Sequence, residues 1–293
     1  MIDPPAEIHR LVYLGTPAES VPFLEALVEA RFDVALVVTR PDKRRGRRAA
    51  PSPSPVRATA SRLGIPTTSD VDDVLDVDAD LGVVVAFGQI IAPPVLDRLA
   101  MVNIHFSGLP RWRGAAPVER AILAGDRVTG VCLMEVDEGL DTGRVYRRVE
   151  VPIAADATTA LLKADLVQAA VPMLIDALRD GLGEPEPQRG EPVYAARITR
   201  DELRLDWNQP AVVLGRQVRV GGAWTTWRGR ILKIWSALPV EGSQTAGELD
   251  GDLAGTGEGR LRLVEVQMEG GRRQTAGDWV RGVRPTPDDR LGS

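Results

Sequence analysis

Length, composition and charge set the first limits on what this chain is. With 293 residues, 44% of them hydrophobic, it is long enough for one large folded domain and a smaller second one. No apolar run approaches the roughly 20 residues that span a bilayer, and the opening residues are acidic and proline-rich, so we expect a cytoplasmic protein. Two histidines and one cysteine are too few for a metal site built from several such ligands, and we expect no metal.

The first elements predict a strand-helix-strand unit. Residues 10–14 and 32–39 are apolar and strand-like. Between them we expect Thr16 as the N-cap of a helix, Pro17 as its first residue and Glu19 as the partner that completes a capping box. Such units build parallel sheets. The segment lacks the Gly-x-Gly-x-x-Gly pattern, which disfavours a dinucleotide-dependent dehydrogenase.

A basic block follows the second predicted strand. The net charge of the chain is -5, yet residues 40–48 read Arg-Pro-Asp-Lys-Arg-Arg-Gly-Arg-Arg. Because residues 49–55 are rich in proline and serine, we expect the whole segment to be an exposed loop. A solvated charged loop and a phosphate-binding surface both fit this pattern.

The middle of the chain predicts two strands that end in candidate site residues. Residues 82–86 are apolar throughout, which is typical of a strand buried on both faces, and residues 87–91 lead off its carboxyl end. Ligands bind outside these ends in open α/β sheets. Asn103 and His105 are two residues apart in the following strand, so both side chains project from the same face.

A carboxylate is expected to join them. After His105 the sequence predicts a turn, a helix at 115–124, a strand at 131–136 and a glycine-rich loop that carries Asp141. An asparagine amide, an imidazolium and a carboxylate together suit attack of an amine on a carbonyl, because the first two stabilise the oxyanion and the third helps to remove the amine proton. A histidine at a strand end is more often only structural. Here the other histidine, His9, lies in the proline-rich leader, so imidazole chemistry would fall to His105.

The second half of the chain predicts a change of architecture. Residues 144–151 suit an antiparallel partner for the strand at 131–136, in which Cys132 is expected to be a buried hydrophobe. Residues 158–182 predict a long amphipathic helix. The stretch 183–192 is rich in Pro, Gly and Glu, which is typical of an interdomain linker.

Short elements follow the linker. We expect one helix at 211–220 and short strands at 230–237, 246–253 and 260–267, a pattern typical of a small barrel. Four tryptophans in this part are expected to be core or hinge residues rather than base-stacking platforms: Trp224, Trp227, Trp235 and Trp279.

Several of these motifs resemble the methionyl-tRNA formyltransferase family. The matching segments are Asn103-x-His105-x-Ser107-x-Leu-Pro110, Arg113-Gly-Ala-Ala-Pro117, Thr129-Gly130-Val, Gly139-Leu-Asp141-Thr-Gly143, Gly15-Thr-Pro17, Tyr194-Ala-Ala-Arg and Leu205-Asp-Trp207. They extend over nearly the whole chain. One departure lies inside the motif. After the histidine the family usually has Gly-Ser-Leu-Leu-Pro, whereas this chain has Phe106-Ser107-Gly108-Leu109-Pro110, so Phe106 and Gly108 differ.

The resemblance implies an α/β fold and a reaction. We expect a Rossmann-like catalytic domain with a mostly parallel sheet over residues 1–187, a linker over 188–206 and a smaller OB-like β-barrel domain over 207–293. The implied reaction moves the formyl group of 10-formyltetrahydrofolate to the α-amine of initiator methionyl-tRNA, for translation initiation. The implied catalytic residues are Asn103, His105 and Asp141. We expect a monomer.

The resemblance also implies binding residues. The folate donor is expected to contact Phe87, Gly88, Ser107, Gly108, Leu109 and Pro110. Methionyl-tRNA is expected to contact Arg40, Lys43, Arg44, Arg45, Arg47, Arg48, Arg197 and Arg200. For the last two, ion pairs with nearby acidic residues are the alternative.

Other functions remain open from the sequence. An amino-sugar N-formyltransferase and a formyltetrahydrofolate hydrolase share the same catalytic triplet. A non-catalytic RNA-binding module that keeps the fold is a third possibility, and the intact triplet argues against it.

Overall fold

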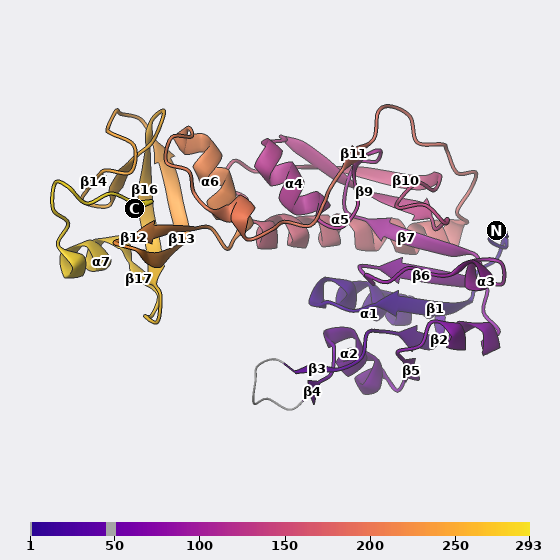
Figure 1. Ribbon diagram of the computed structural model, residues 1–293. Helices are drawn as coiled ribbons and strands as arrows, with labels where there is room; N and C mark the ends of the chain where they lie inside the picture. The colour runs from indigo at the N-terminus through magenta and orange to yellow at the C-terminus, as the bar shows by residue number, and fades with distance from the viewer. Residues whose placement is uncertain (1, 45–50) are drawn as a thin grey trace. The chain divides into compact units, whose positions relative to one another are not determined.

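The chain folds into two compact units in the computed structural model, which describes residues 2–44 and 51–293 (Figure 1). The first unit comprises Met1–Val118, Val128–Pro152 and Leu162–Ala196, and the second comprises Glu119–Arg127, Ile153–Leu161 and Arg197–Ser293. Among the described residues, no helix is both long enough and apolar enough to cross a membrane.

A seven-stranded sheet in the order β10-β9-β7-β6-β1-β2-β5 forms the centre of the first unit (Figure 1). Its strands are β1 (Arg10–Gly15), β2 (Asp33–Val38), β5 (Thr67–Thr68), β6 (Leu81–Val85), β7 (Met101–His105), β9 (Val128–Glu135) and β10 (Val145–Pro152). The strands from β7 to β5 run parallel, whereas β9 is antiparallel to both β7 and β10. The predicted mostly parallel sheet, with an antiparallel pair at one edge, is confirmed.

Apolar sequence explains why β1 and β6 lie in the middle of this sheet. All residues of β6 are buried, and β1 is buried from Leu11 to Gly15. A strand covered on both faces needs such a continuous apolar run. On one face the strand residues pack with Phe87, Val95 and Leu96, which follow β6 in the chain.

The helices of the first half follow local signals. They are η1 (Ala18–Ser20), α1 (Val21–Glu29), α2 (Pro55–Leu63), η2 (Asp72–Asp76), α3 (Pro93–Leu96), α4 (Pro117–Ala124) and α5 (Thr159–Asp180). In α2 the Ser54 hydroxyl accepts a hydrogen bond from the amide of Arg57, Pro55 opens the helix and Gly64 closes it in the left-handed conformation.

The capping box predicted at Thr16 is wrong. The chain forms the short turn η1 before α1, with Pro17 as the N-cap of η1 and no capping side chain. The Thr16 hydroxyl instead accepts from the amide of Arg40 and donates to the carbonyl of Phe87, both at 3.4 Å. Because Thr16 follows β1 directly, its hydroxyl is used to join the segments that leave β2 and β6.

The predicted linker stretch is more ordered than its composition indicates. The residues just after the stretch 183–192 form β11 (Val193–Tyr194), which pairs in parallel with β8 (Arg111–Arg113). Glu186 forms an isolated antiparallel bridge with Val145. A second short pair joins β3 (Lys43–Arg44) to β4 (Pro51–Ser52).

The second unit is built on an antiparallel sheet of six strands. Its elements are η3 (Asp201–Leu203), α6 (Ala211–Val220), β12 (Trp224–Trp227), β13 (Arg230–Val240), β14 (Leu249–Asp250), β15 (Leu253–Gly255), β16 (Arg260–Met268), β17 (Gln274–Thr275) and α7 (Ala276–Val283). The order is β12-β13-β16-β15-β14, with β17 also paired to β16. A smaller β-rich domain after the catalytic domain is confirmed.

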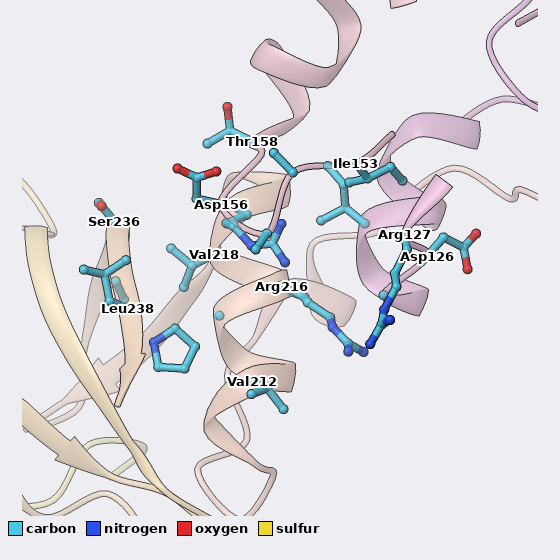
Figure 2. Close-up of a pocket in the computed structure, with 18 of the residues that line it drawn as sticks. Asp126, Arg127, Ile153, Asp156, Thr158, Val212, Arg216, Val218, Ser236 and Leu238 are labelled. Atoms are coloured by element: carbon cyan, nitrogen blue, oxygen red, sulfur yellow. The ribbon is translucent and has the colours of Figure 1, made fainter. Parts of the chain in front are cut away.

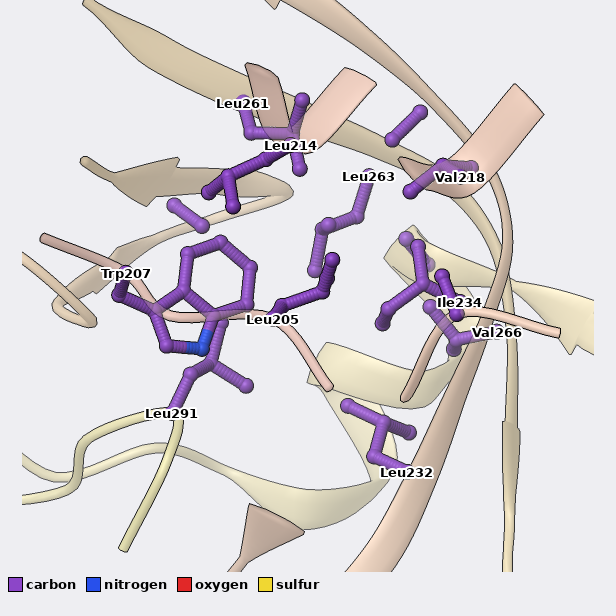
Figure 3. Close-up of a cluster of buried hydrophobic side chains, with 14 of the residues drawn as sticks. Leu205, Trp207, Leu214, Val218, Leu232, Ile234, Leu261, Leu263, Val266 and Leu291 are labelled. Atoms are coloured by element: carbon purple, nitrogen blue, oxygen red, sulfur yellow. The ribbon is translucent and has the colours of Figure 1, made fainter. Parts of the chain in front are cut away.

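A single hydrophobic cluster fills the second unit (Figure 3). Leu214 and Val218 of α6 point from the helix onto Leu261, Leu263 and Ile234 of the sheet. These helix positions are four residues apart and so lie on one face. The cluster has no ionisable side chain, so it contributes stability rather than chemistry.

The tryptophans of this unit divide into two groups. Trp227 and Trp279 are buried and meet edge to face, with ring centroids 5.3 Å apart, which confirms their assignment to the core. Trp224 is half-buried, and Trp235 is 43% exposed. Of the predicted core or hinge positions, Trp235 does not occupy a core one, because the alternation along β13 turns it to the face opposite buried Ile234.

Candidate active site

Strand β7 places Asn103 and His105 on one face, as its alternation predicts. In the adjacent strand β9, Asn103 lies opposite Met134 and His105 lies opposite Cys132. Cys132 is fully buried, which confirms the predicted buried position, and this burial raises the pKa of its thiol. The side chain of His105 is only 6% exposed, and Asn103 is half-buried. Both polar groups therefore lie at the carboxyl edge of the parallel strands, close to solvent but mostly shielded from it.

Both ring nitrogens of His105 face oxygen atoms. Nε2 lies 2.9 Å from the carbonyl oxygen of Trp112, and Nδ1 lies 3.5 Å from Oδ1 of Asp141. A carbonyl oxygen only accepts, so Nε2 carries the proton of that hydrogen bond. A neutral imidazole has one N–H and can donate to one of these two oxygens, whereas the imidazolium has two and can donate to both. An N–H directed at a substrate must first leave Trp112 or Asp141.

The loop after β7 aims the Trp112 carbonyl at the histidine. Trp112 has φ of +65°, in the left-handed region that a bulky residue rarely adopts. The buried hydroxyl of Ser107 donates to the carbonyl of Arg111 at 2.7 Å and so holds the turn. Strained backbone of this kind concentrates at functional sites.

The loop that carries Asp141 is held by its own short contacts. The Asp137 carboxylate accepts from the amide of Gly139 at 3.1 Å and from the hydroxyl of Thr142 at 2.8 Å. Gly143 lies so close to the carbonyl of Glu135 that an added Cβ would overlap that oxygen. Gly143 is therefore required by close approach of the backbone, whereas a Cβ at Gly139 would meet the side chain of Thr142.

Asp141 connects the two loops. Its Oδ2 accepts a hydrogen bond of 2.8 Å from the amide of Gly114, while Oδ1 faces His105. Its φ is +53°, again in the left-handed region. Three polar residues were predicted to converge at one edge of the sheet. The structure brings His105 and Asp141 into contact, and Asn103 lies on the same strand as His105. Sequence reasoning missed Trp112 and Gly114, because both act through backbone atoms.

The residues expected to bind folate surround this edge, with different exposures. Phe87 and Leu109 are buried, and the exposed Gly88 accepts a 2.9 Å hydrogen bond from Arg40 at its carbonyl. Gly108 is exposed and an added Cβ would meet nothing within 4 Å. Ser107 is buried and Pro110 is half-buried. Their contact with a folate donor remains a prediction.

The departure at Phe106 is absorbed by the core. Its ring lies 6.3 Å from that of Phe23 in α1, centroid to centroid, and the side chain is buried. The change therefore adds packing between β7 and a helix without placing an aromatic group at the exposed edge.

The basic residues expected to contact tRNA fall into four groups. Arg45, Arg47 and Arg48 lie outside the described residues, and Lys43 and Arg44 form β3. Arg40 is half-buried. Arg197 and Arg200 are exposed, and the Arg200 guanidinium lies 4.9 Å from the ring centroid of Trp224. Arg204 stacks on the same ring at 5.5 Å. Sequence reasoning missed this cation-π stack.

The second unit contains a pocket of about 660 Å³, shown in Figure 2. Three arginines line it, namely Arg127, Arg216 and Arg219, and Figure 2 shows the guanidinium groups of Arg127 and Arg216 facing each other. Burial and the nearby Arg216 lower the pKa of Arg219. Asp126 and Asp156 also line the pocket. Its size lies in the range of ligand sites, and the clustered positive charge suits an anion.

Sequence reasoning missed this arginine cluster. Arg216 and Arg219 are three residues apart on α6 and therefore share a face, a signal that the sequence does contain. Arg127 comes from a distant part of the chain, and only the fold brings it to them. In residues 2–44 and 51–293, no group of three His, Cys, Asp or Glu side chains is placed to hold a metal ion.

Comparison with known proteins identifies the family of the chain. Family models for the formyl transferase domain and the formyl transferase C-terminal domain match residues 9–178 and 197–284. A methionyl-tRNA formyltransferase of Jannaschia sp. (strain CCS1) is 40% identical, over 95% of this chain and 98% of the relative. That of Dinoroseobacter shibae is 41% identical, over 94% of this chain and 97% of the relative.

A solved structure of HypX from Aquifex aeolicus in complex with tetrahydrofolic acid has the same fold. It is 19% identical, with a TM-score of 0.68, over 94% of this chain and 47% of that chain. The matches to curated relatives extend through both units, including the loops that hold His105 and Asp141. The chain belongs to the methionyl-tRNA formyltransferase family.

Proposed function

We propose that this protein transfers the formyl group of 10-formyltetrahydrofolate to the α-amine of methionyl-tRNA. The observation that carries the proposal is the His105–Asp141 pair, held between two loops beside Asn103 in a chain of this family. The relatives are named for this activity, and tetrahydrofolic acid is bound in the HypX structure. The intact pair argues against a non-catalytic RNA-binding module.

The chemistry follows from these groups. The amine of methionyl-tRNA attacks the formyl carbon, a C–N bond forms, and negative charge develops on the formyl oxygen. The side-chain amide of Asn103 makes no hydrogen bond with any described residue, so it is free to donate to that oxygen. His105 donates to the same oxygen after its ring leaves the Trp112 carbonyl, and Oδ1 of Asp141, which faces Nδ1, orients the ring.

Collapse of the intermediate completes the transfer. The bond between the formyl carbon and N10 of the donor breaks, and N10 takes up a proton while the attacking amine loses one. Asp141 and His105 lie where they can assist this exchange. No covalent bond to the enzyme is required, and donor and acceptor bind at the same time.

The donor and acceptor occupy different sides of the site in this proposal. Phe87, Gly88 and the segment Ser107 to Pro110 form the wall for the pterin ring. The acceptor end of tRNA contacts the basic residues, namely Arg40, Lys43, Arg44, Arg45, Arg47, Arg48, Arg197 and Arg200, together with the pocket arginines Arg127, Arg216 and Arg219. Clustered guanidinium groups bind successive phosphates.

Several further expectations belong to the same proposal. The catalytic domain covers residues 1–187, the linker 188–206 and an OB-like barrel 207–293. The protein acts as a cytoplasmic monomer in translation initiation, without a metal.

A salt titration tests the acceptor. The logarithm of the binding constant falls linearly with the logarithm of the salt concentration, and each phosphate contact that is lost reduces the steepness of this fall by roughly 0.7 to 0.9. Replacement of Arg127 and Arg216 by Ala should therefore weaken methionyl-tRNA binding and flatten this slope, while folate affinity stays unchanged. Exposed Arg98, replaced by Ala, is the matched control. Equal slopes for parent and double variant would exclude this cluster from the tRNA surface.

A further inference from the structure

Gln188 makes four hydrogen bonds at the edge of the active site, although it lies in a stretch whose composition indicates only a linker. Its Nε2 donates to the carbonyl of Asp141 at 2.9 Å and to the carbonyl of Gly143 at 2.8 Å. Its Oε1 accepts from Nε and Nη2 of Arg113 at 3.0 and 2.7 Å. Arg113 ends the short strand β8 in the segment after β7, here called the Arg113 loop. Asp141 lies in the segment after β9, here called the Asp141 loop. One amide therefore ties together the two loops that hold His105.

The orientation of this amide is fixed by chemistry. A guanidinium offers only donors, so Arg113 faces the amide oxygen, and carbonyl oxygens only accept, so Asp141 and Gly143 face the amide nitrogen. The flipped amide would set donors against donors and acceptors against acceptors. A glutamate at this position keeps the partner of Arg113 and loses both donors to the Asp141 loop.

The backbone around Gln188 is itself anchored to the same two loops. Glu186 and Val145 exchange two hydrogen bonds of 2.8 and 2.9 Å at the end of the Asp141 loop. On the other side, the amide of Val193 donates to Pro110, and the amide of Ala195 donates to the carbonyl of Arg113 at 2.6 Å. The side chain of Gln188 therefore extends from a segment that is fixed at both ends.

Asp141 needs such support. Its left-handed φ of +53° is costly for a residue with a side chain, and its carboxylate has to reach both the amide of Gly114 and the ring of His105. The hydrogen bond from Gln188 to the Asp141 carbonyl restrains this residue at its backbone. A displacement of about 1 Å at a reacting group costs on the order of 10²-fold in rate.

We propose that Gln188 is a positioning residue for formyl transfer, which acts by holding the Asp141 loop against the Arg113 loop. The proposal rests on the formyltransferase function above. Gln188 does not touch the reacting atoms, so its loss should lower kcat and leave the binding of both substrates nearly unchanged.

Gln188→Glu and Gln188→Ala test this proposal by steady-state kinetics. Each should lower kcat by about 10- to 100-fold, with KM for methionyl-tRNA and for the folate donor within about threefold of the parent. The matched control is Gln217→Glu, because the Gln217 Nε2 likewise donates to a backbone carbonyl, that of Glu202, at 2.8 Å in the second unit. The control should retain parental kcat. Parental kcat in both Gln188 variants, with unchanged thermal unfolding, would overturn the proposal.

A double-variant cycle separates positioning from general stability. If Gln188 acts through Asp141, then Gln188→Glu should cost less than about threefold in the Asp141→Asn background, measured under single-turnover conditions. Full additivity would show that Gln188 acts elsewhere and would overturn the proposal.

Hydrogen exchange separates this inference from the proposed function. Amides of residues 139–143 should exchange faster in Gln188→Glu than in Gln217→Glu, whichever reaction the site performs. Unchanged exchange would refute the positioning role. Absence of formylation by the parent protein, with the exchange difference present, would instead refute the proposed function.

Discussion

Asp141→Asn is the substitution that most sharply tests the charge at the site. The introduced amide has one oxygen, which takes the hydrogen bond from the amide of Gly114, now made by Oδ2 at 2.8 Å. Its NH₂ group then faces Nδ1 of His105, where Oδ1 lies at 3.5 Å in the parent. Because that NH₂ is a donor, it can pair with Nδ1 only as an acceptor, and the contact between Nδ1–H and a carboxylate oxygen is lost.

The geometry survives this change, but the negative charge beside His105 is lost. Loss of one preorganised electrostatic contact costs on the order of 10² to 10³ in kcat, or about 2.7 to 4 kcal/mol of transition-state stabilisation. We expect the midpoint of thermal unfolding to change little, since the side chain is replaced by one of the same shape that keeps the Gly114 contact.

Nitrogen NMR of the imidazole reports the contact made by each ring nitrogen. The chain has two histidines, and His9 is 80% exposed, so the resonance of buried His105 is readily distinguished. Asp141→Asn should shift the Nδ1 resonance of His105, because Nδ1 loses its carboxylate neighbour, and should leave the Nε2 resonance nearly unchanged, because Nε2 keeps the Trp112 carbonyl as its partner. An unchanged Nδ1 resonance, or a kcat for the variant within threefold of the parent, would refute this account of the pair.

Three further predictions address the loop, the core and an ion pair. Gly143→Ala should lower kcat at least tenfold, because the added Cβ overlaps a backbone carbonyl and displaces the Asp141 loop; a folded variant with parental kcat would exclude this. Leu214→Ala should lower the unfolding free energy by about 2 to 5 kcal/mol in denaturant titration, since Leu214 is fully buried in the second unit. Glu202 pairs with Arg120, and this partner lowers the pKa of Glu202 from 4.5 to about 2. The ion pair therefore stabilises the fold above pH 4.5, and the stabilisation is lost as the pH falls towards 2. Glu202→Gln should therefore unfold at a lower temperature than the parent at pH 7, by an amount that corresponds to less than about 1 kcal/mol, and the difference should shrink as the pH falls towards 2 and disappear below it.

Local patterns predicted the elements that hold the candidate site. Alternation along residues 101–105 placed Asn103 and His105 on one face, and the structure has them there. The continuous apolar run at residues 82–86 predicted the strand β6, which is buried throughout. These signals are local, because the spacing of apolar residues and the caps act within one element.

Long-range contacts of irregular backbone could not be predicted in this way. The carbonyl that faces His105 comes from Trp112 because of an unusual φ, which no composition signals. Gln188 lies in a stretch of Pro, Gly and Glu and acts on loops more than 40 residues earlier in the chain. Thr16 failed as a cap because neighbouring strand ends offered its hydroxyl other partners.

Trp235 shows the same limit in the second unit. Its apolar ring predicted burial, but its register in β13 turned it outward, where the Arg273 guanidinium lies 4.9 Å from its centroid. The register is decided by the other strands and by the helix that covers the opposite face.

The central claim is that the site joins a formyl group to the amine of methionyl-tRNA, and one assay with three acceptors tests it most directly. The parent protein and 10-formyltetrahydrofolate are incubated with methionyl-tRNA, with an amino-sugar nucleotide or with water alone, and both formyl product and released tetrahydrofolate are measured. We expect formyl-methionyl-tRNA in amounts that match the tetrahydrofolate released, and this product should be lost in His105→Ala. Formylation of the sugar nucleotide instead, or release of tetrahydrofolate without any formylated acceptor, would contradict the claim.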